Sequence, residues 1–222
     1  MPTSVGHSII GLGVALGFSP GRRLKDILGD RGTLVLALVL ANLADLDLLI
    51  GLLVDGSAAR YHGLFMHSVF FAAVVAGLVA FLPWPAVPAW RRFAFALALL
   101  LSHPLADMLQ SPWGARLFSG PGVRVFTPLS NERWSFPVSL FLGVEYQTWR
   151  QLVSVRTAVI VLLELSCLLP LLLLADALRG GGTRRPVIRV VRGATAPEDG
   201  RAASAPAMRR WCRSRSKMRR GE

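Results

Sequence analysis

The sequence contains little charge and almost no cysteine. Only 17% of its 222 residues are charged, while 53% are hydrophobic and the mean hydropathy is +0.49; a typical soluble domain has about 25% charged residues. The two cysteines, Cys167 in an apolar run and Cys212 in a basic run, would lie in different surroundings. This excludes a disulfide framework and a zinc site built on thiolates. The low charge instead indicates an integral membrane protein.

The N-terminus lacks the features of a cleaved signal peptide. The segment MPTSVGHSIIGLGVALG has no basic residues before its apolar part and no small-residue cleavage site, and His7 interrupts it. Its apolar part, Val5–Phe18, is shorter than the roughly 20 residues needed to cross a bilayer. We therefore predict a short helix that packs against the rest of the protein.

Longer apolar stretches predict four membrane spans, at Thr33–Val54, Leu64–Leu82, Phe93–Leu109 and Thr157–Leu178. With the short N-terminal helix, they give an all-α integral membrane protein with a membrane-embedded domain at residues 1–178. Between the third and fourth spans, proline and glycine are frequent. This region is predicted to form loops and short helices that cover one end of the bundle.

Basic residues are distributed unevenly along the chain. The formal net charge is +12, and 13 of the 25 lysines and arginines lie in residues 179–222. This segment has no hydrophobic periodicity and is predicted to be a disordered tail. With four spans, the tail shares one side with the basic loops 19–32 and 83–92, which the positive-inside rule places in the cytoplasm. The expected partner of the tail is anionic lipid rather than nucleic acid, because the tail follows a membrane span.

Polar ligand-type side chains share one end of the predicted bundle. His103 and Asp107 lie four residues apart in LLLSHPLADMLQ, so a helix places them on one face, one turn apart. Because neighbouring spans are antiparallel, the same non-cytoplasmic end receives residues from three spans and from the link before the second span: Asp45, Asp47, His62, His67, His103 and Asp107. His7 joins them if the N-terminal helix runs antiparallel to the first span.

Imidazole and carboxylate groups together suit zinc, iron or manganese. A divalent ion would offset the cost of burying these groups and would activate a bound water. Each residue also has a simpler interpretation: His67 as a packing residue, Asp45 and Asp47 as residues that end a span, and His103 with Asp107 as a private hydrogen bond. The convergence of all four histidines with three aspartates favours the metal site.

Four short motifs resemble those of a known family: GH at Gly6–His7, NLADLD at Asn42–Asp47, HGLFMHS at His62–Ser68 and LSHPLADML at Leu101–Leu109. In this order they are similar to the YdjM-like family of bacterial membrane-bound metal-dependent hydrolases. A weaker match is FTPLSNERWSFP, at residues 126–137. The chain departs from the family at Ala44, where the family has proline, and at Gly63 and Met66, within a segment that in the family reads His-Arg-Gly-Phe-Thr-His-Ser.

The order of an early His, then Asp, His and His-x3-Asp is also similar to that of zinc-dependent phospholipase C, although no histidine follows His103. Together the resemblances imply an inner-membrane hydrolase that cleaves a phosphoester bond of a lipid-like substrate such as a phospholipid. They also imply that the hydrolase uses a divalent ion, with zinc as the first candidate. The implied metal ligands are Asp45, Asp47, His67, His103 and Asp107. His7 and His62 are implied as further ligands or as catalytic acid–base groups.

Two other classes of protein remain compatible with the sequence. A b-type haem protein would use His67 and His103 as axial ligands from neighbouring spans. A non-catalytic membrane scaffold or metal-binding protein would use the basic tail for its interactions.

Overall fold

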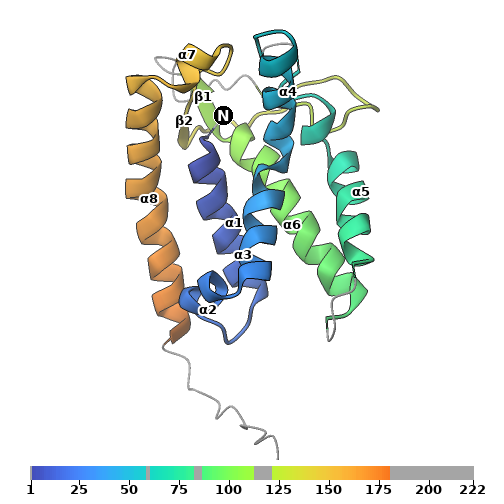
Figure 1. Ribbon diagram of the computed structural model, residues 1–222, viewed down its shortest axis with the longest axis vertical. Helices are drawn as coiled ribbons and strands as arrows, with labels where there is room; N and C mark the ends of the chain where they lie inside the picture. The colour runs from blue at the N-terminus through green and yellow to red at the C-terminus, as the bar shows by residue number, and fades with distance from the viewer. Residues whose placement is uncertain (1, 59–60, 83–86, 113–121, 181–222) are drawn as a thin grey trace, which may run out of the picture. The chain divides into compact units, whose positions relative to one another are not determined.

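Apolar helices make up most of the computed structural model, which describes residues 2–58, 61–82, 87–112 and 122–180. These residues belong to one compact unit, Met1–Thr183. The helices, drawn in Figure 1, are α1 (Ser4–Phe18), α2 (Leu24–Gly29), α3 (Arg31–Asn42), η1 (Leu43–Asp45), α4 (Leu46–Val54), η2 (Phe65–His67), α5 (Val69–Ala80), α6 (Ala89–Met108), α7 (Trp149–Leu152) and α8 (Val155–Gly180).

The all-α prediction is correct for most of this part of the chain. The described residues also include two short strands, β1 (Gln110–Pro112) and β2 (Phe141–Gly143), which pair in parallel. The predicted tail, residues 179–222, lies outside the described residues except for Arg179 and Gly180, which end α8.

Two helical segments are long and apolar enough to cross a membrane. They are Arg31–Val54, which runs from α3 through η1 to α4 with a mean hydropathy of 2.1, and Val155–Arg179 in α8, with 2.6. The other two predicted spans differ from expectation. Helix α5 has 12 residues, or about 18 Å of helix, because the chain before it forms the 3-10 turn η2. Helix α6 has 20 residues but includes Arg91, Arg92 and Asp107, which lower its hydropathy.

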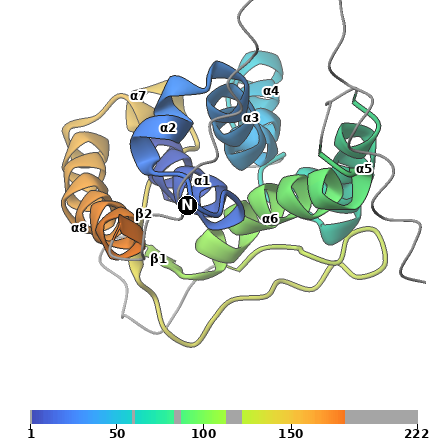
Figure 2. The same ribbon diagram turned by 90° about the horizontal axis from the view of Figure 1, so that it is seen from below.

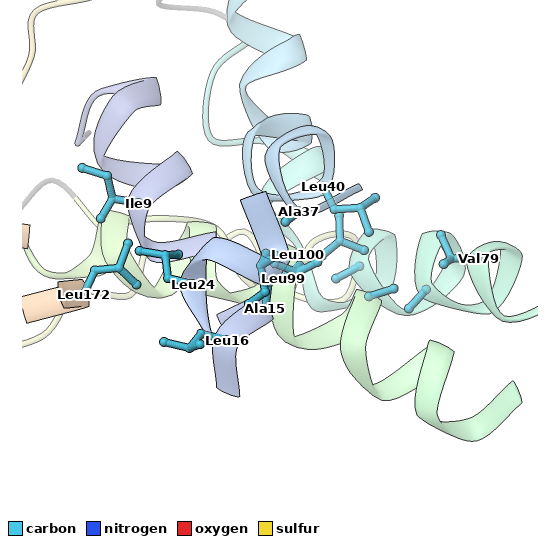
Figure 3. Close-up of a cluster of buried hydrophobic side chains, with 14 residues drawn as sticks. Ile9, Ala15, Leu16, Leu24, Ala37, Leu40, Val79, Leu99, Leu100 and Leu172 are labelled. Carbon is cyan, nitrogen blue, oxygen red and sulfur yellow. The ribbon is translucent and has the colours of Figure 1, made fainter. Parts of the chain in front are cut away.

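Helix α1 contacts three of the long helices, α3, α6 and α8, and α5 packs against α6 (Figures 1 and 2). Side chains from these helices, including Leu16, Leu99 and Leu172, form the main apolar core (Figure 3). Large apolar side chains nevertheless remain exposed on α5 and α8, such as Leu78 and Leu162, which are each 65% exposed. Extended apolar surface of this kind is expected on helices that face lipid.

Small residues allow α1 and α3 to approach closely. A Cβ atom on Gly11 would lie 2.7 Å from the Cβ of Ala41 and 3.1 Å from the carbonyl oxygen of Ala37. Such contacts between small residues are typical of helix pairs in membranes. Because His7 lies four residues before Gly11, it is on the same face of α1. The contact at Gly11 therefore determines how closely His7 approaches α3 and α6.

The substitution Gly11→Ala is expected to destabilise the protein by about 1–3 kcal/mol, because the added methyl group has no room against Ala41. Gly13→Ala is the matched control, since its Cβ would meet only Leu172, at 3.9 Å. The free energy of unfolding of this control should rise by up to about 1 kcal/mol, because alanine has a higher helix propensity than glycine. Unfolding in detergent, followed by circular dichroism, measures both. Equal stability of the two variants would contradict the role given to Gly11.

After α6, the chain folds back over the end of the helices. Backbone N–H groups of Leu140 and Phe136 donate to the carbonyls of Leu109 and Met108, at 2.7 and 2.9 Å. The N–H of Val69, at the start of α5, donates to the carbonyl of Val125 at 2.9 Å. The loops predicted to cover this end are therefore present in residues 122–148, with a short sheet in addition.

Candidate metal centre

The pair His103 and Asp107 lies on one face of α6, as the sequence spacing predicts. His103 Nε2 is 3.5 Å from Asp107 Oδ2, and both residues are at most 1% exposed. His103 Nδ1 lies 2.7 Å from the carbonyl oxygen of Ala41, in the last turn of α3, where helix carbonyls lack partners within the helix. Because a carbonyl only accepts, Nδ1 carries the proton, which leaves Nε2 with a lone pair in the neutral ring.

The junction of α3 and α4 supplies two carboxylates that face different neighbours. Asp45 ends the 3-10 turn η1, and its Oδ1 lies 3.3 Å from His103 Nε2. Asp47 lies in the first turn of α4 and faces the segment that leads into α5. Its Oδ1 is 3.1 Å from His62 Nδ1, and its Oδ2 is 3.1 Å from His67 Nδ1. Residues two apart on a helix point in different directions, so Asp45 lies closest to His103, whereas Asp47 lies closest to His62 and His67.

A glycine turn brings His62 and His67 to the same aspartate. Gly63 has a φ of +77°, in the left-handed region that favours glycine. Its N–H donates to Asp47 Oδ2 at 3.2 Å. The short turn η2 then places His67, which is fully buried, with Nε2 3.3 Å from Asp107 Oδ2. His67 and His103 are therefore oriented in the same way. In each ring, Nδ1 faces outward to an acceptor, either Asp47 or the Ala41 carbonyl, and Nε2 points toward the centre of the cluster. This orientation is usual for histidines that bind metals.

Helix α1 contributes His7, which is 1% exposed. Its ring stacks on that of His103, with centroids 3.6 Å apart and an interplanar angle of 11°. Its Nε2 lies 3.5 Å from Asp107 Oδ1. All seven polar residues predicted to converge are therefore close together at one end of the helices.

Glu164, in the middle of α8, holds the start of α1 beside this centre. Its carboxylate accepts hydrogen bonds from the backbone N–H of Thr3, at 2.9 Å, and from the Thr3 hydroxyl. A Cβ on Gly6 would lie 2.6 Å from Glu164 Oε2, so the glycine allows this close approach. The sequence does not reveal this contact, because nothing local indicates which helix end Glu164 meets.

Most of the nitrogen and oxygen atoms that could bind a metal at this centre are buried and make no hydrogen bond. They are both ring nitrogens of His7, Nε2 of His67 and of His103, and both carboxylate oxygens of Asp45 and Asp107. Buried polar atoms are almost always satisfied in native proteins. Within the described part of the chain, moreover, the ion-pair partners found for Asp45, Asp47 and Asp107 are all histidines. A cation would supply the missing partner and charge.

The spacing of these atoms fits a divalent ion. Donor atoms of Asp45, His67, His103 and Asp107 that approach one another do so at 3.3–3.5 Å. Ligands of a tetrahedral ion with bonds of about 2.0–2.1 Å stand about 3.3–3.4 Å apart. Three overlapping groups have all their donor atoms within 4.8 Å of one another: His7, His103 and Asp107; Asp45, His67 and His103; and Asp47, His62 and His67.

Tyr146 is a neighbour of the centre that the sequence does not reveal. Its ring meets that of His62 edge to face, with centroids 4.4 Å apart. Burial and the nearby Asp107 carboxylate raise the pKa of the Tyr146 phenol. It follows β2, far along the chain from His62, and no local motif indicates the contact. The side of the centre next to Tyr146 is also the more exposed one, since His62 is 8% exposed whereas His67 and His103 are 0% exposed.

Most of the chain matches a known protein family. Residues 1–179 match the family of the YdjM inner membrane protein, whereas no curated protein and no solved structure is significantly similar. The matched region contains all seven residues of the centre and extends to the last turn of α8. It also contains the two helical segments able to cross a membrane. The chain belongs to the YdjM inner membrane protein family and is a membrane protein.

Proposed function

We propose that the protein is a membrane-bound, metal-dependent hydrolase that acts on phosphoester bonds of a lipid-like substrate. The observation that carries the proposal is the cluster of buried, unpartnered histidine and aspartate atoms at one end of the helices. The hydrolase activity is supported by the resemblance of the motifs to metal-dependent hydrolases, and zinc is the ion that best suits this mixture of imidazole and carboxylate groups.

Asp45, His67 and His103, which form one candidate ligand group, would hold the principal ion. Asp107 would join them, because its Oδ2 lies 3.3 Å from His67 Nε2 and 3.5 Å from His103 Nε2. Asp47 orients His67 and also belongs to a group with His62 that would accept a second ion. His7, expected as an acid–base group or further ligand, is almost fully buried against Asp107. Its position favours the ligand role.

When bound, a divalent ion lowers the pKa of a coordinated water and polarises a phosphoryl oxygen. His62 is the residue best positioned for proton transfer, since it lies at the more exposed edge of the cluster. Asp47 Oδ1 fixes its Nδ1 at 3.1 Å, which leaves Nε2 to accept a proton from water or to donate one to the leaving oxygen. The ring of Tyr146 restricts the movement of His62.

The proposed topology has four spans, with α5 and α6 embedded beside the two longer segments. The metal centre then lies on the non-cytoplasmic side of the inner membrane. The support is the distribution of basic residues in the described part of the chain. Seven lie at the opposite ends of the helices (Arg22, Arg23, Lys25, Arg31, Arg91, Arg92 and Arg179), against four at the end with the metal centre (Arg124, Arg133, Arg150 and Arg156). Residues 1–178 form the membrane-embedded domain, and the basic tail contacts anionic lipid in the cytoplasm.

Haem binding is disfavoured by the geometry of the two central histidines. The rings of His67 and His103 have centroids 5.1 Å apart. Asp107 Oδ2 lies 3.3 Å and 3.5 Å from their Nε2 atoms. A carboxylate in this position occupies the space that a porphyrin between the two rings would need.

Metal binding without catalysis is the second candidate function. Its support is the burial of His67, His103 and Asp107, which are at most 1% exposed. Structural metal sites are closed, whereas catalytic sites keep a position open for water or substrate.

The experiment that tests the proposal combines metal analysis with a hydrolysis screen. Purified protein in nanodiscs is expected to contain zinc or another divalent ion and to hydrolyse a phospholipid or a soluble phosphodiester. A chelator should abolish the reaction and zinc should restore it. Bound metal without any hydrolysis would favour the metal-binding function, and folded protein that binds no divalent ion would overturn both.

A further inference from the structure

A second polar site lies at the opposite end of α1 and α6 from the metal centre. It is a cavity of about 460 Å³ whose lining includes Arg22, Arg91, Arg92, Phe18, Trp90 and Phe95. Phe18 lies eleven positions after His7 on α1, and His103 lies eleven positions after Arg92 on α6, so each pair is separated by about 16 Å of helix. The cavity is therefore separate from the metal centre.

The cavity has more positive than negative charge. Arg22 Nη2 lies 3.1 Å from Asp30 Oδ2, and hydrogen bonds from Thr33 lower the pKa of Asp30, so these two charges cancel. Arg91 and Arg92 have no carboxylate partner among the described residues. Two positive charges at the cavity thus lack a counter-ion within this part of the chain.

Both unpaired arginines have positions that suit an oxyanion. The Arg91 guanidinium lies 5.2 Å from the centre of the Trp90 ring, which holds it by a cation–π contact. Arg92 donates from one terminal nitrogen to the carbonyl of Leu82, and its Nε is buried with no hydrogen-bond partner. A buried N–H without an acceptor is costly, so an acceptor oxygen at this point would stabilise the protein.

Three of the other lining residues, Phe18, Trp90 and Phe95, are aromatic. The rings of Phe18 and Phe95 pack together, with centroids 5.7 Å apart. Trp90 is 66% exposed, as is common for tryptophans at the boundary between membrane and water. A ligand that fits this lining has an anionic group beside an apolar part. Guanidinium groups match phosphate in particular, because their N–H groups bind two oxygens at once.

We propose that this cavity binds the phosphate head group of an anionic phospholipid, with Arg91 and Arg92 on the phosphate and the aromatic rings on the glycerol and first acyl carbons. Lipid is favoured over soluble phosphate because the chain is a membrane protein and because five of the eleven lining residues are apolar or aromatic. The inference is independent of the metal centre and of any hydrolase activity.

The test compares binding of two lipids to the full-length protein in a neutral detergent. Dioleoyl phosphatidylglycerol and dioleoyl phosphatidylcholine are titrated, and bound lipid is counted by native mass spectrometry. Wild-type protein should bind the anionic lipid in preference. The variant Arg91→Gln with Arg92→Gln should bind it about 30-fold more weakly, which corresponds to about 1 kcal/mol for each arginine.

The matched control is Arg31→Gln with Arg150→Gln, which removes two exposed arginines outside the cavity and should bind as the wild type does. Since Arg92 also contacts the Leu82 carbonyl, Arg91→Gln alone is a second variant that keeps this contact, with an expected loss of about fivefold. Equal affinity for the two lipids, or equal losses in both double variants, would overturn the proposal. So would inorganic phosphate that displaces the anionic lipid at equal concentration, since this would indicate a soluble ligand.

Discussion

Replacement of both His103 and Asp107 by alanine is expected to lower the metal affinity of the purified protein by more than about 100-fold, since loss of even an outer partner of a ligand costs 10–100-fold. His103 belongs to two of the three candidate ligand groups. Its Nε2 is within 3.3–3.5 Å of both Asp45 and Asp107. Without this pair, two of the three groups lose a ligand, and only the group of Asp47, His62 and His67 stays intact. Elemental analysis after dialysis against a weak chelator measures the effect.

Asp55→Asn is the control for this variant, because Asp55 ends α4 close to the centre in sequence but is exposed and outside every candidate ligand group. It should retain the wild-type metal content. Zinc should also raise the melting temperature of the wild type and of this control, because a ligand that binds only the folded state stabilises it. A double alanine variant that is folded and still holds a full complement of metal would refute the assignment.

The convergence of the seven polar residues was predictable because it depends on simple periodicities. The i, i+4 spacing of His103 and Asp107 determines their common face on α6, and the structure places Nε2 3.5 Å from Oδ2. The antiparallel order of neighbouring helices determines which helix ends meet. Neither argument requires knowledge of side-chain packing, and both hold even though α5 is shorter than predicted.

Other features depend on contacts that no local pattern encodes. The 3-10 turn η1 between α3 and α4 cannot be recognised in the sequence, because the whole segment Arg31–Val54 is apolar enough to resemble one continuous span. The roles of Gly11 and Glu164 depend on the residues that lie opposite them. Gly11 faces Ala41 in α3, and Glu164 faces Thr3 at the start of α1. Tyr146 reaches His62 only because the chain after α6 folds back over the helix ends.

His62→Ala is expected to reduce the rate of hydrolysis by about 10²–10⁴-fold, the usual contribution of a general acid or base, while most of the bound metal remains. His62 occurs only in the ligand group with Asp47 and His67, and the group of Asp45, His67 and His103 does not need it. Initial rates and metal content, measured on the same preparation, separate a loss of chemistry from a loss of the ion.

Tyr146→Phe is the control for this second variant, since it keeps the ring that packs on His62 at 4.4 Å and removes only the hydroxyl. It should hydrolyse substrate at close to the wild-type rate. A His62→Ala protein with both full metal content and the wild-type rate would show that another group transfers the proton. Because His7, His67 and His103 are at most 1% exposed, the ion-bound water itself would then have to exchange protons directly with solvent or substrate.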